Sequence, residues 1–568
     1  MEKRALIAIG ISFAILVLWQ FVFPPPKDLP PADKIEKPAE AMDMKESEKP
    51  KEDTAQRIET VQDAPASFQP IVDSEAREIT VESSLYTIKF SNRRGVVLSW
   101  KLKGYRDDTG EPLELVSPES KVFDIYPLEI KTGSEELNEK IRDALLRVKV
   151  EKGKVNGRNQ QKVDGQIVSF EFADEEGLSI VKKLGIPDNE YFPSFEFAIS
   201  ERGERIPASI LWGSSFGSVL GKPTNYSYAG QCIARVSGKL SRVAKKNVEN
   251  IKTIVGNVTW AGMENQYFCS IFIPLSSAEK VDILAERRNV GEGKEEKYLA
   301  IAMPSPEKEY MLYVGPKDYR LLSAAGSGLQ QIVNFGSISF IAWVAKGLYF
   351  SLVWLYNHTV ANYGIGIILI TIAIRIAFFP LTQKSFVSMK KMQTQMKKVQ
   401  PKIKSIKERY QKKKKMDFQS RQKMNQEIMD LYKKEGINPM GGMSGCLPLL
   451  LQLPFLWAFY NVLTAAIELR HASFILWITD LSVADPWLIT PILMGGTMLI
   501  QQKMAGVTTS DPLQQKMMTY FMPIFFTIFF LKVPSGLVLY WLVNNVLGIG
   551  QQYLINKQAA RLLAEGKQ

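Results

Sequence analysis

Residues 363–381 read YGIGIILITIAIRIAFFPL, an apolar run that contains one charged residue, Arg375. As a helix, the run is long enough to cross a bilayer core of roughly 30 Å. A guanidinium inside such a span costs on the order of 2.5–3.5 kcal/mol on insertion scales, and more by other estimates. Ionisable residues in spans usually face a wet or polar cavity. We therefore expect Arg375 to mark a functional site.

Two threonines share the helical face of Arg375. Thr371 lies four residues before it and Thr382 seven residues after it, so all three side chains fall on one side of a helix. None of the apolar segments has an acidic residue at its middle to neutralise the guanidinium. The pattern favours a polar cavity that receives a group from outside the protein, or water. The alternative is an arginine that only extends toward the membrane surface.

Other apolar segments also carry uncharged polar residues. Gln452 lies in one of them, and Asn544 and Asn545 lie in the last one. Tyr540 and Trp541 precede these asparagines on the same segment. Ordinary hydrogen bonding between helices is the alternative to a shared polar surface.

The chain has six candidate membrane spans. Five lie in its second half, at 363–383, 447–467, 486–503, 514–531 and 536–555. The sixth is MEKRALIAIGISFAILVLWQFVF at 1–23, where Lys3 and Arg4 precede a long apolar run that no small-residue cleavage site follows. This run favours an uncleaved signal anchor over a cleaved signal peptide. Basic residues of the loop and tail indicate that both chain termini are cytoplasmic.

We divide the chain by composition and pattern, since 568 residues are too many for one core. The predicted parts are a signal anchor at 1–23, a disordered Pro-rich and charged tether at 24–70, a β-sandwich at 71–325, an interfacial amphipathic helix at 326–361, a five-span core at 362–556 with a cytoplasmic helical hairpin at 384–436, and a basic tail at 557–568. The sandwich follows an anchor whose N-terminus is cytoplasmic, so it lies on the outer side of the membrane.

Alternating apolar residues predict the strands of the β-sandwich. GVVLSWKL at 95–102 places Val96, Leu98, Trp100 and Leu102 at period two, and QIVSFEFA, KYLAIAM and YMLYVG repeat the pattern between turn-rich breaks. Many short strands with little helix indicate an all-β sandwich. A carbohydrate-binding or processing module is a possible function for such a domain, but the fold alone assigns no activity.

The loop at 384–436 has a net positive charge as large as that of the whole chain. It contains 17 Lys or Arg against five Asp or Glu, a balance equal to the net charge of +12. Apolar residues at spacing three to four predict two amphipathic helices at about 385–411 and 416–435. The loop suits an anionic lipid surface, or docking of a ribosome or targeting receptor. It has no aromatic platform, so we expect no specific nucleic-acid sequence recognition.

Composition argues against several chemistries. Two histidines make a histidine-built metal site improbable, and no phosphate-binding loop or nucleophile elbow occurs. We therefore expect no catalytic residues, no metal and no cofactor. The three cysteines form no disulfide framework, and pairing of Cys232 with Cys269 stays open.

Three long stretches strongly resemble the YidC/Oxa/Alb family of membrane protein insertases. They are NPMGGMSGCLPLLLQLPFLWAFYNVL at 438–463, ELRHASFILWITDLSVADPW at 468–487 and DPLQQKMMTYFMPIFFTIFFLKVPSGLVLYWLVNNVLGIGQQ at 511–552. The anchor, tether and outer β-domain resemble the Gram-negative form, in which TWAGMENQYF at 259–268 is similar to a family segment. The resemblance implies a polytopic α-helical membrane protein of six transmembrane helices, five of which form the insertase core, plus a periplasmic all-β sandwich.

The resemblance also implies a site and a function. The groove arginine of the family falls on Arg375, its threonine on Thr371 and its aromatic residue on either Tyr540 or Trp541. The polar pattern of the spans adds Thr382, Gln452, Asn544 and Asn545 to the expected hydrophilic groove. The expected substrate-contacting faces carry Pro448, Leu451, Phe455, Phe459, Met494, Met522, Phe526 and Phe530. The implied function is a non-enzymatic insertase and chaperone of the bacterial inner membrane. Its partners would be nascent membrane proteins, the Sec translocon, a ribosome or receptor, and the lipid bilayer.

A solute- or ion-coupled transporter is the rival class of function. Such a protein would show internal repeats, broken spans and paired ionisable groups, whereas this chain has a single intramembrane arginine.

Overall fold

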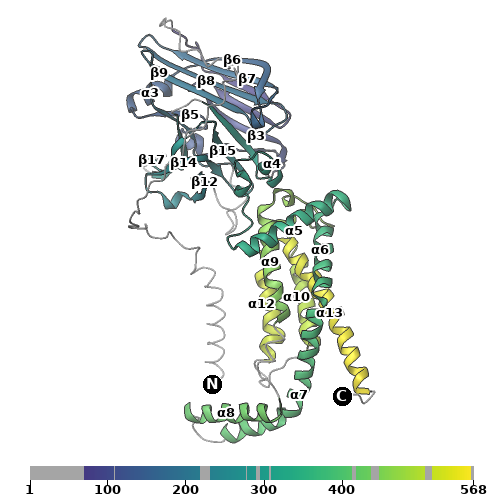
Figure 1. Ribbon diagram of the computed structural model, residues 1–568. Helices are drawn as coiled ribbons and strands as arrows, with labels where there is room; N and C mark the ends of the chain where they lie inside the picture. The colour runs from purple at the N-terminus through teal and green to yellow at the C-terminus, as the bar shows by residue number, and fades with distance from the viewer. Residues whose placement is uncertain are drawn as a thin grey trace, which may run out of the picture. The chain divides into compact units, whose positions relative to one another are not determined.

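The computed structural model describes residues 70–564, apart from gaps at 108, 218–229, 277, 290–294, 306–308, 412–417, 437–446 and 506–514. The predicted signal anchor, nearly all of the tether and the last four residues lie outside the described residues. Figure 1 shows the strands gathered in one region and the long helices in another.

The strands form two main antiparallel sheets. The smaller contains, in order, β1 (Glu78–Glu82), β2 (Tyr86–Ser91), β3 (Val96–Arg106) and β4 (Pro112–Glu114). The larger has 14 strands, which are β5 (Glu129–Thr132), β6 (Arg147–Asn156), β7 (Lys162–Ala173), β8 (Leu178–Pro187), β9 (Ser194–Glu201), β10 (Glu204–Arg205), β11 (Ala208–Trp212), β12 (Gln231–Val236), β13 (Lys239–Val243), β14 (Ile251–Glu264), β15 (Phe268–Pro274), β16 (Ala278–Leu284), β19 (Ala300–Ser305) and β20 (Glu309–Pro316). A separate ribbon pairs β17 (Arg287–Asn289) with β18 (Glu295–Lys297).

One apolar core joins the two sheets. Alternate residues of β2 are buried, as expected for a strand with one face on a core. The ring of Phe90 on β2 meets Phe170 on β7 at 5.6 Å, and Trp100 on β3 meets Trp212 on β11 at 6.1 Å. The strand-rich region predicted at 71–325 is therefore a β-domain whose two sheets pack face to face.

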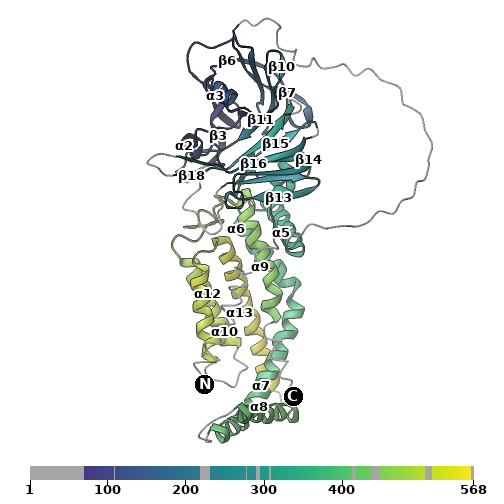
Figure 2. The same cartoon turned by 90° about the vertical axis from the view of Figure 1, so that its left-hand side faces the viewer.

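Helices are few in the β-domain and long after it. They are α2 (Glu119–Phe123), α3 (Glu135–Asp143), α4 (Tyr319–Ala324), α5 (Ser339–His358), α6 (Tyr363–Ala377), α7 (Phe379–Gln411), α8 (Phe418–Lys434), α9 (Leu447–Ala465), α10 (Ile489–Ala505), the π-helical turn η6 (Met517–Phe521), α12 (Met522–Phe530) and α13 (Ser535–Ala564). Figure 2 shows α10, α12 and α13 together in the helix bundle. The tail predicted from residue 557 instead continues α13 to Ala564.

The six-span count is not confirmed. Among the described helices, α5 alone is long and apolar enough to cross a membrane, and the bent pair α6–α7 would supply a second span. Figure 1 shows α5 lying across the ends of the other long helices. Its exposed face carries Phe340, Trp343 and Trp354, which suits the interfacial position predicted for this segment.

The segment at 363–383 is two helices, not one. Between α6 and α7 the chain bends by 60°. Pro380 contributes to the bend, because it has no N–H to donate to the carbonyl of Ile376, and the helix is interrupted at Phe378. Arg375 consequently lies in the last turn of α6 and not in the middle of a straight span.

A buried ionic cluster lies at the end of β14. Glu264 is fully buried, and its carboxylate meets Lys317 Nζ at 2.8 Å and Arg242 Nε at 2.7 Å. Burial alone would raise the pKa of Glu264, but these two cations outweigh it and hold the pKa below its ordinary value. Arg242 also donates to the carbonyl of Ile332, which ties the β-domain to the chain that leads into the helices.

Lys182 on β8 is buried in the β-domain with its charge satisfied by backbone. Its Nζ donates to the carbonyls of Arg94, Gly95 and Leu128 at 2.7–3.0 Å. Burial lowers the pKa of Lys182 to about 7.

Cys232 and Cys269 are free and buried. Cys232 lies opposite Met263 of β14, and Cys269 lies opposite Glu264 of the same strand. Successive residues of a strand point to opposite faces of a sheet, so the two thiols lie on opposite faces. The structure therefore settles the open pairing: these cysteines form no disulfide.

Candidate functional site

Arg375 is buried near the end of α6. Its side chain is 8% exposed. The α6 helix begins at a capping Asn362, whose side chain accepts a hydrogen bond from the backbone of Ile365. Because the 60° bend ends α6 two residues after Arg375, the guanidinium belongs to the negative end of the helix dipole. The bend therefore lowers the cost of burying this cation.

The guanidinium approaches α13 at Gly548. A Cβ atom at Gly548 would lie 2.9 Å from Arg375 Nη2 and 2.4 Å from Gln501 Nε2. Glycine lets this arginine and this glutamine keep these positions against α13, because a Cβ atom would displace the ends of both side chains. Neither Gly548 nor Gln501 is among the residues predicted for the site.

The charge of Arg375 is not neutralised within the described part of the chain. Its Nε and Nη2 atoms are buried and have no hydrogen-bond acceptor among those residues. No described carboxylate forms a salt bridge with it. A buried guanidinium without an acceptor is costly unless something else supplies a negative or polar group.

One face of α13 carries polar residues in line with Gly548, where the guanidinium of Arg375 approaches this helix. Tyr540, Asn544, Gly548 and Gln551 recur at intervals of three or four residues. Tyr540 lies close enough to interact electrostatically with the guanidinium. We call Arg375, Thr382, Gln452, Gln501, Tyr540, Asn544 and Gln551 the Arg375 cluster.

Within the Arg375 cluster, hydrogen bonds join α13 to α9 and to α7. Gln452 of α9 donates to Asn544 at 3.3 Å, and Gln551 donates to Thr382 of α7 at 3.1 Å. Thr371 is buried on α6, but its hydroxyl donates to the carbonyl of Ile367 in its own helix.

Asn545 faces a different helix. It donates to the Met494 carbonyl at 3.2 Å and to Thr497 Oγ1 at 3.3 Å, both on α10. Asn544 and Asn545 were predicted as groove residues together, but the structure brings only Asn544 to the Arg375 cluster. Asn545 makes ordinary hydrogen bonds between helices, the alternative that the sequence left open for these polar residues.

The two aromatic residues on α13 have different surroundings. Tyr540 packs on Phe459 of α9 with ring centroids 4.6 Å apart. Trp541 packs on Phe526 and Phe530 of α12 at 5.8 and 5.4 Å. Tyr540 is therefore the aromatic residue beside Arg375.

The residues expected to contact substrate differ in exposure. Phe459, Met494 and Phe530 are buried inside the bundle, and Leu451, Phe455, Met522 and Phe526 are half-buried. The side chain of Pro448 lies outside the described residues. Among the described side chains of α9 and α12, the large exposed apolar ones are Trp457, Ile524, Ile528 and Phe529.

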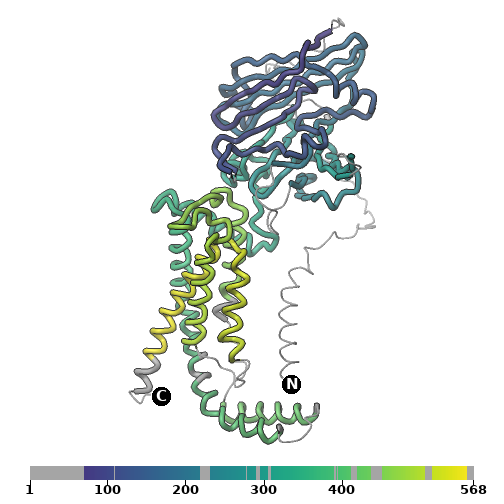
Figure 3. The backbone as a smooth tube through the Cα atoms, turned by 180° about the vertical axis from the view of Figure 1, so that it is seen from behind, coloured from purple at the N-terminus to yellow at the C-terminus, as the bar shows by residue number. Residues whose placement is uncertain are grey.

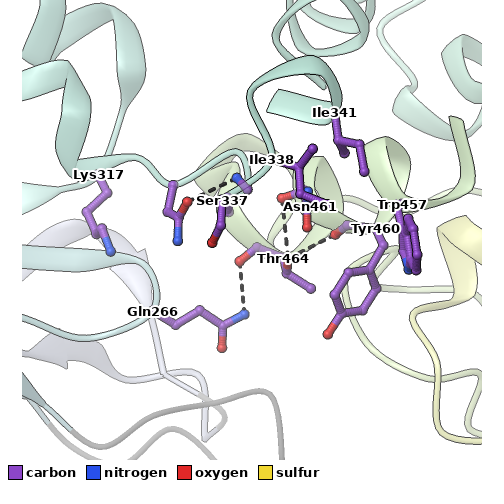
Figure 4. Close-up of a pocket in the computed structure, with 12 residues that line it drawn as sticks. Gln266, Lys317, Ser337, Ile338, Ile341, Trp457, Tyr460, Asn461 and Thr464 are labelled. Carbon is purple, nitrogen blue, oxygen red and sulfur yellow. Dashed lines mark hydrogen bonds between the residues drawn. The ribbon is translucent and has the colours of Figure 1, made fainter. Parts of the chain in front are cut away.

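A cavity of about 410 Å³ lies away from the Arg375 cluster, where the β-domain meets α9. Figure 4 shows Gln266 of the β-domain directed at Thr464, and its amide donates to the Thr464 carbonyl at 3.0 Å. On the other side, Asn461 donates to the Phe335 carbonyl at 2.9 Å. These polar groups of the cavity join the β-domain, its connecting chain and α9, so we assign the cavity a structural role.

Within the described residues, no three His, Cys, Asp or Glu side chains are grouped closely enough to hold a metal ion.

The fold and the Arg375 cluster define a multi-helix membrane protein with a buried cation and a separate β-sheet domain. Residues 354–561 match the family model "60Kd inner membrane protein", and residues 78–349 match "YidC periplasmic domain". The chain is 35% identical to Membrane protein insertase YidC of Syntrophus aciditrophicus, over 98% of this chain and 100% of the relative. It is 33% identical to the protein of the same name from Geotalea daltonii, over 98% and 99%.

The chain belongs to the YidC family of membrane protein insertases, which is not a class of enzymes. It is an inner-membrane protein with a periplasmic domain. Among solved structures, a crystal structure of an active YidC insertase with its first transmembrane domain resolved is 19% identical, with a TM-score of 0.34 over 86% of this chain and 95% of that one. YidC from Thermotoga maritima is 14% identical, with a TM-score of 0.28 over 85% and 98%.

Proposed function

We propose that this insertase uses the Arg375 cluster as a hydrophilic groove for the polar tail of a nascent membrane protein. The observation that carries the proposal is the buried guanidinium, which has two nitrogens without an acceptor and no carboxylate beside it in the described chain. An acidic group in a substrate tail would supply the missing negative charge. The groove would lower the cost of moving a short polar segment partway across the membrane.

The apolar segment of the substrate would leave the groove along α9 and α12. Exposed apolar side chains on these helices, including Trp457, Ile524 and Ile528, offer apolar surface for this step. Transfer of apolar surface out of water would drive this step, and membrane potential would add to it for charged tails.

The helical hairpin of α7 and α8 is the proposed docking surface for a ribosome or targeting receptor. Val399 and Ile403 of α7 pack on Ile428 and Leu431 of α8, which turns the lysines outward. Figure 3 shows this hairpin at the end of the bundle opposite the β-domain. Its basic surface supports the cytoplasmic placement of the hairpin. We also propose the Sec translocon as a partner and a cytoplasmic location for both chain termini.

Complementation tests the role of Arg375. Cells depleted of the insertase receive the wild type, Arg375→Ala, Arg375→Lys or Arg375→Glu, and insertion is followed for a single-span reporter with an acidic or a neutral translocated tail. We expect Arg375→Glu to impair the acidic reporter most and Arg375→Lys to retain much of the activity. Arg287→Ala, at an exposed position on β17 of the β-domain, is the matched control. Equal insertion of the acidic reporter by wild type and Arg375→Glu would remove the electrostatic role.

The transporter alternative is not favoured. The curated relatives that match nearly the whole chain are named insertases, and no described carboxylate forms a salt bridge with Arg375.

A further inference from the structure

The loop between α9 and α10, residues 466–488, is apolar on two sides. We call it the outer loop, because Arg470 in it donates to the carbonyl of Arg106 in the β-domain at 2.8 Å. On its inner side Ile478 and Leu481 are buried in the core of the bundle. On its other side Leu476 is 78% exposed and Trp487 is 66% exposed. Packing inside the protein accounts for the apolar residues on the inner side but not for those on the exposed side.

The outer loop is held rigidly by the helices around it. Asn362, at the start of α6, donates to the Phe474 carbonyl at 2.9 Å. Ser535, at the start of α13, donates to the carbonyls of Val483 and Asp480 at 2.6 and 2.9 Å. The exposed side chains are therefore presented from a fixed backbone, so they cannot turn inward.

Backbone conformation and aromatic packing both keep apolar groups on the surface. Leu476 has φ of 54° and Leu488 has φ of 58°, a left-handed conformation that a leucine adopts rarely. Trp487 stacks on Trp477, with ring centroids 6.1 Å apart and planes at 6°. The Trp477 indole donates to the buried carboxylate of Asp485, so its polar group needs no water.

The exposed patch continues onto exposed apolar side chains of the neighbouring helix. On α10, Ile492 and Leu493 are exposed one turn after Trp487 and Leu488. At the same end of the bundle, α5 carries the exposed ring of Trp343. A rigid patch of this kind, with tryptophans beside larger aliphatic groups and next to the end of a span, fits the boundary between headgroups and acyl chains.

The charges of the outer loop do not fit an anionic partner. Arg470 faces the β-domain, where it lies over the rings of Tyr267 and Phe268. His471 lies 3.8 Å from Asp480. The contact must therefore be hydrophobic, with little dependence on salt or on the charge of the lipid.

We propose that the outer loop is a membrane-inserted element, whose Ile475, Leu476, Val483 and Trp487 enter the outer leaflet beside α10. It would close the bundle on its inner side and fix the depth of the protein in the bilayer on its outer side. This inference rests on the family membership of the chain and not on the role proposed for Arg375.

Spin labelling of the full chain tests the proposal. Cys446 is replaced by Ser, the buried Cys232 and Cys269 are kept, and a nitroxide is attached after Leu476→Cys. Val483→Cys serves if that variant does not fold. Labels after Thr109→Cys in an exposed β-domain turn and Ile492→Cys on α10 are the aqueous and lipid references. The protein is reconstituted, one copy per nanodisc, in phosphatidylcholine alone or in phosphatidylethanolamine with phosphatidylglycerol.

Collision rates with oxygen and with a water-soluble nickel chelate distinguish the occupants of the patch. We expect the oxygen-to-nickel ratio of the outer-loop label to exceed that of Thr109→Cys several-fold, equally in both lipids and at high salt. A nickel rate as high as that of Thr109→Cys would place the patch in water and overturn the proposal. Low rates with both reagents would mean that protein covers the patch, either another part of this chain or a bound partner. That result would overturn it as well.

Discussion

The close contact at Gly548 allows the position of the Arg375 charge to be changed without removing it. In Gly548→Ala, the new Cβ would lie 2.9 Å from Arg375 Nη2 and 2.4 Å from Gln501 Nε2. To regain an ordinary contact of 3.4 Å, the guanidinium must move by about 0.5 Å and the amide by about 1 Å. The neighbouring Gly550 is the matched control, because a Cβ there would meet nothing within 4 Å.

The two alanine variants should differ in stability. Replacing glycine by alanine inside a helix gains roughly 0.8–1 kcal/mol. At Gly550 this gain should appear in full as a higher midpoint of thermal unfolding. At Gly548 the new Cβ displaces the mobile ends of two long side chains, so the overpacking cost should lie near the lower end of about 1–3 kcal/mol and cancel most of the gain. The protein should therefore remain folded.

Insertion should respond to the displacement of the charge. Two unit charges 4 Å apart attract by about 4 kcal/mol at an effective dielectric constant near 20, and this energy falls inversely with distance. A shift of about 0.5 Å then costs roughly 0.5 kcal/mol, which is about twofold in rate. Reconstituted vesicles, with acidic and neutral tails inserted in parallel, measure the effect. The acidic tail should slow in Gly548→Ala alone, and equal rates in both alanine variants would refute the reasoning.

Three further predictions concern packing and pH. In Gly495→Ala the new Cβ would lie 1.9 Å from Thr527 Oγ1, so thermal unfolding should show a loss of about 1–3 kcal/mol, whereas Gly496→Ala should show none. The pKa of Glu264 is lower in the folded protein than in the unfolded chain, so its carboxylate contributes stability above about pH 4.5. This contribution is lost as the pH falls through the folded-state pKa. Glu264→Gln should therefore make the free energy of unfolding depend less on pH in the acidic range. The pKa of Lys182 is about 7 in the folded protein, so the unfolded chain binds its proton more tightly. The free energy of unfolding should therefore rise between pH 7 and about 10, and Lys182→Met should lack this rise.

Apolar patterning predicted the main elements because burial in lipid or in a core requires it. The period-two runs became strands, and the segments near 447–467 and 486–503 became α9 and α10. The bend after Arg375 was missed, although its signal is printed in the sequence as Phe379–Pro380. An unbroken apolar run outweighed a proline that interrupts the helix.

The composition of the site was predictable, but its arrangement was not. The sequence showed that Asn544 and Asn545 are polar residues in an apolar segment, but neighbouring positions on a helix face in different directions. Which asparagine faces Arg375 depends on the rotation of α13 against α6 and α10. Gly548 has no side chain to draw attention, and its importance appears only once Arg375 and Gln501 are placed beside it.

The opposite placement of Cys232 and Cys269 has a consequence for the redox sensitivity of the β-domain. Burial raises the pKa of both thiols, so neither is a ready nucleophile for an oxidant or for thiol exchange. The folded β-domain therefore needs no cross-link between these two cysteines and shields both thiols from oxidants. Its stability does not depend on the redox poise of the compartment in which it works.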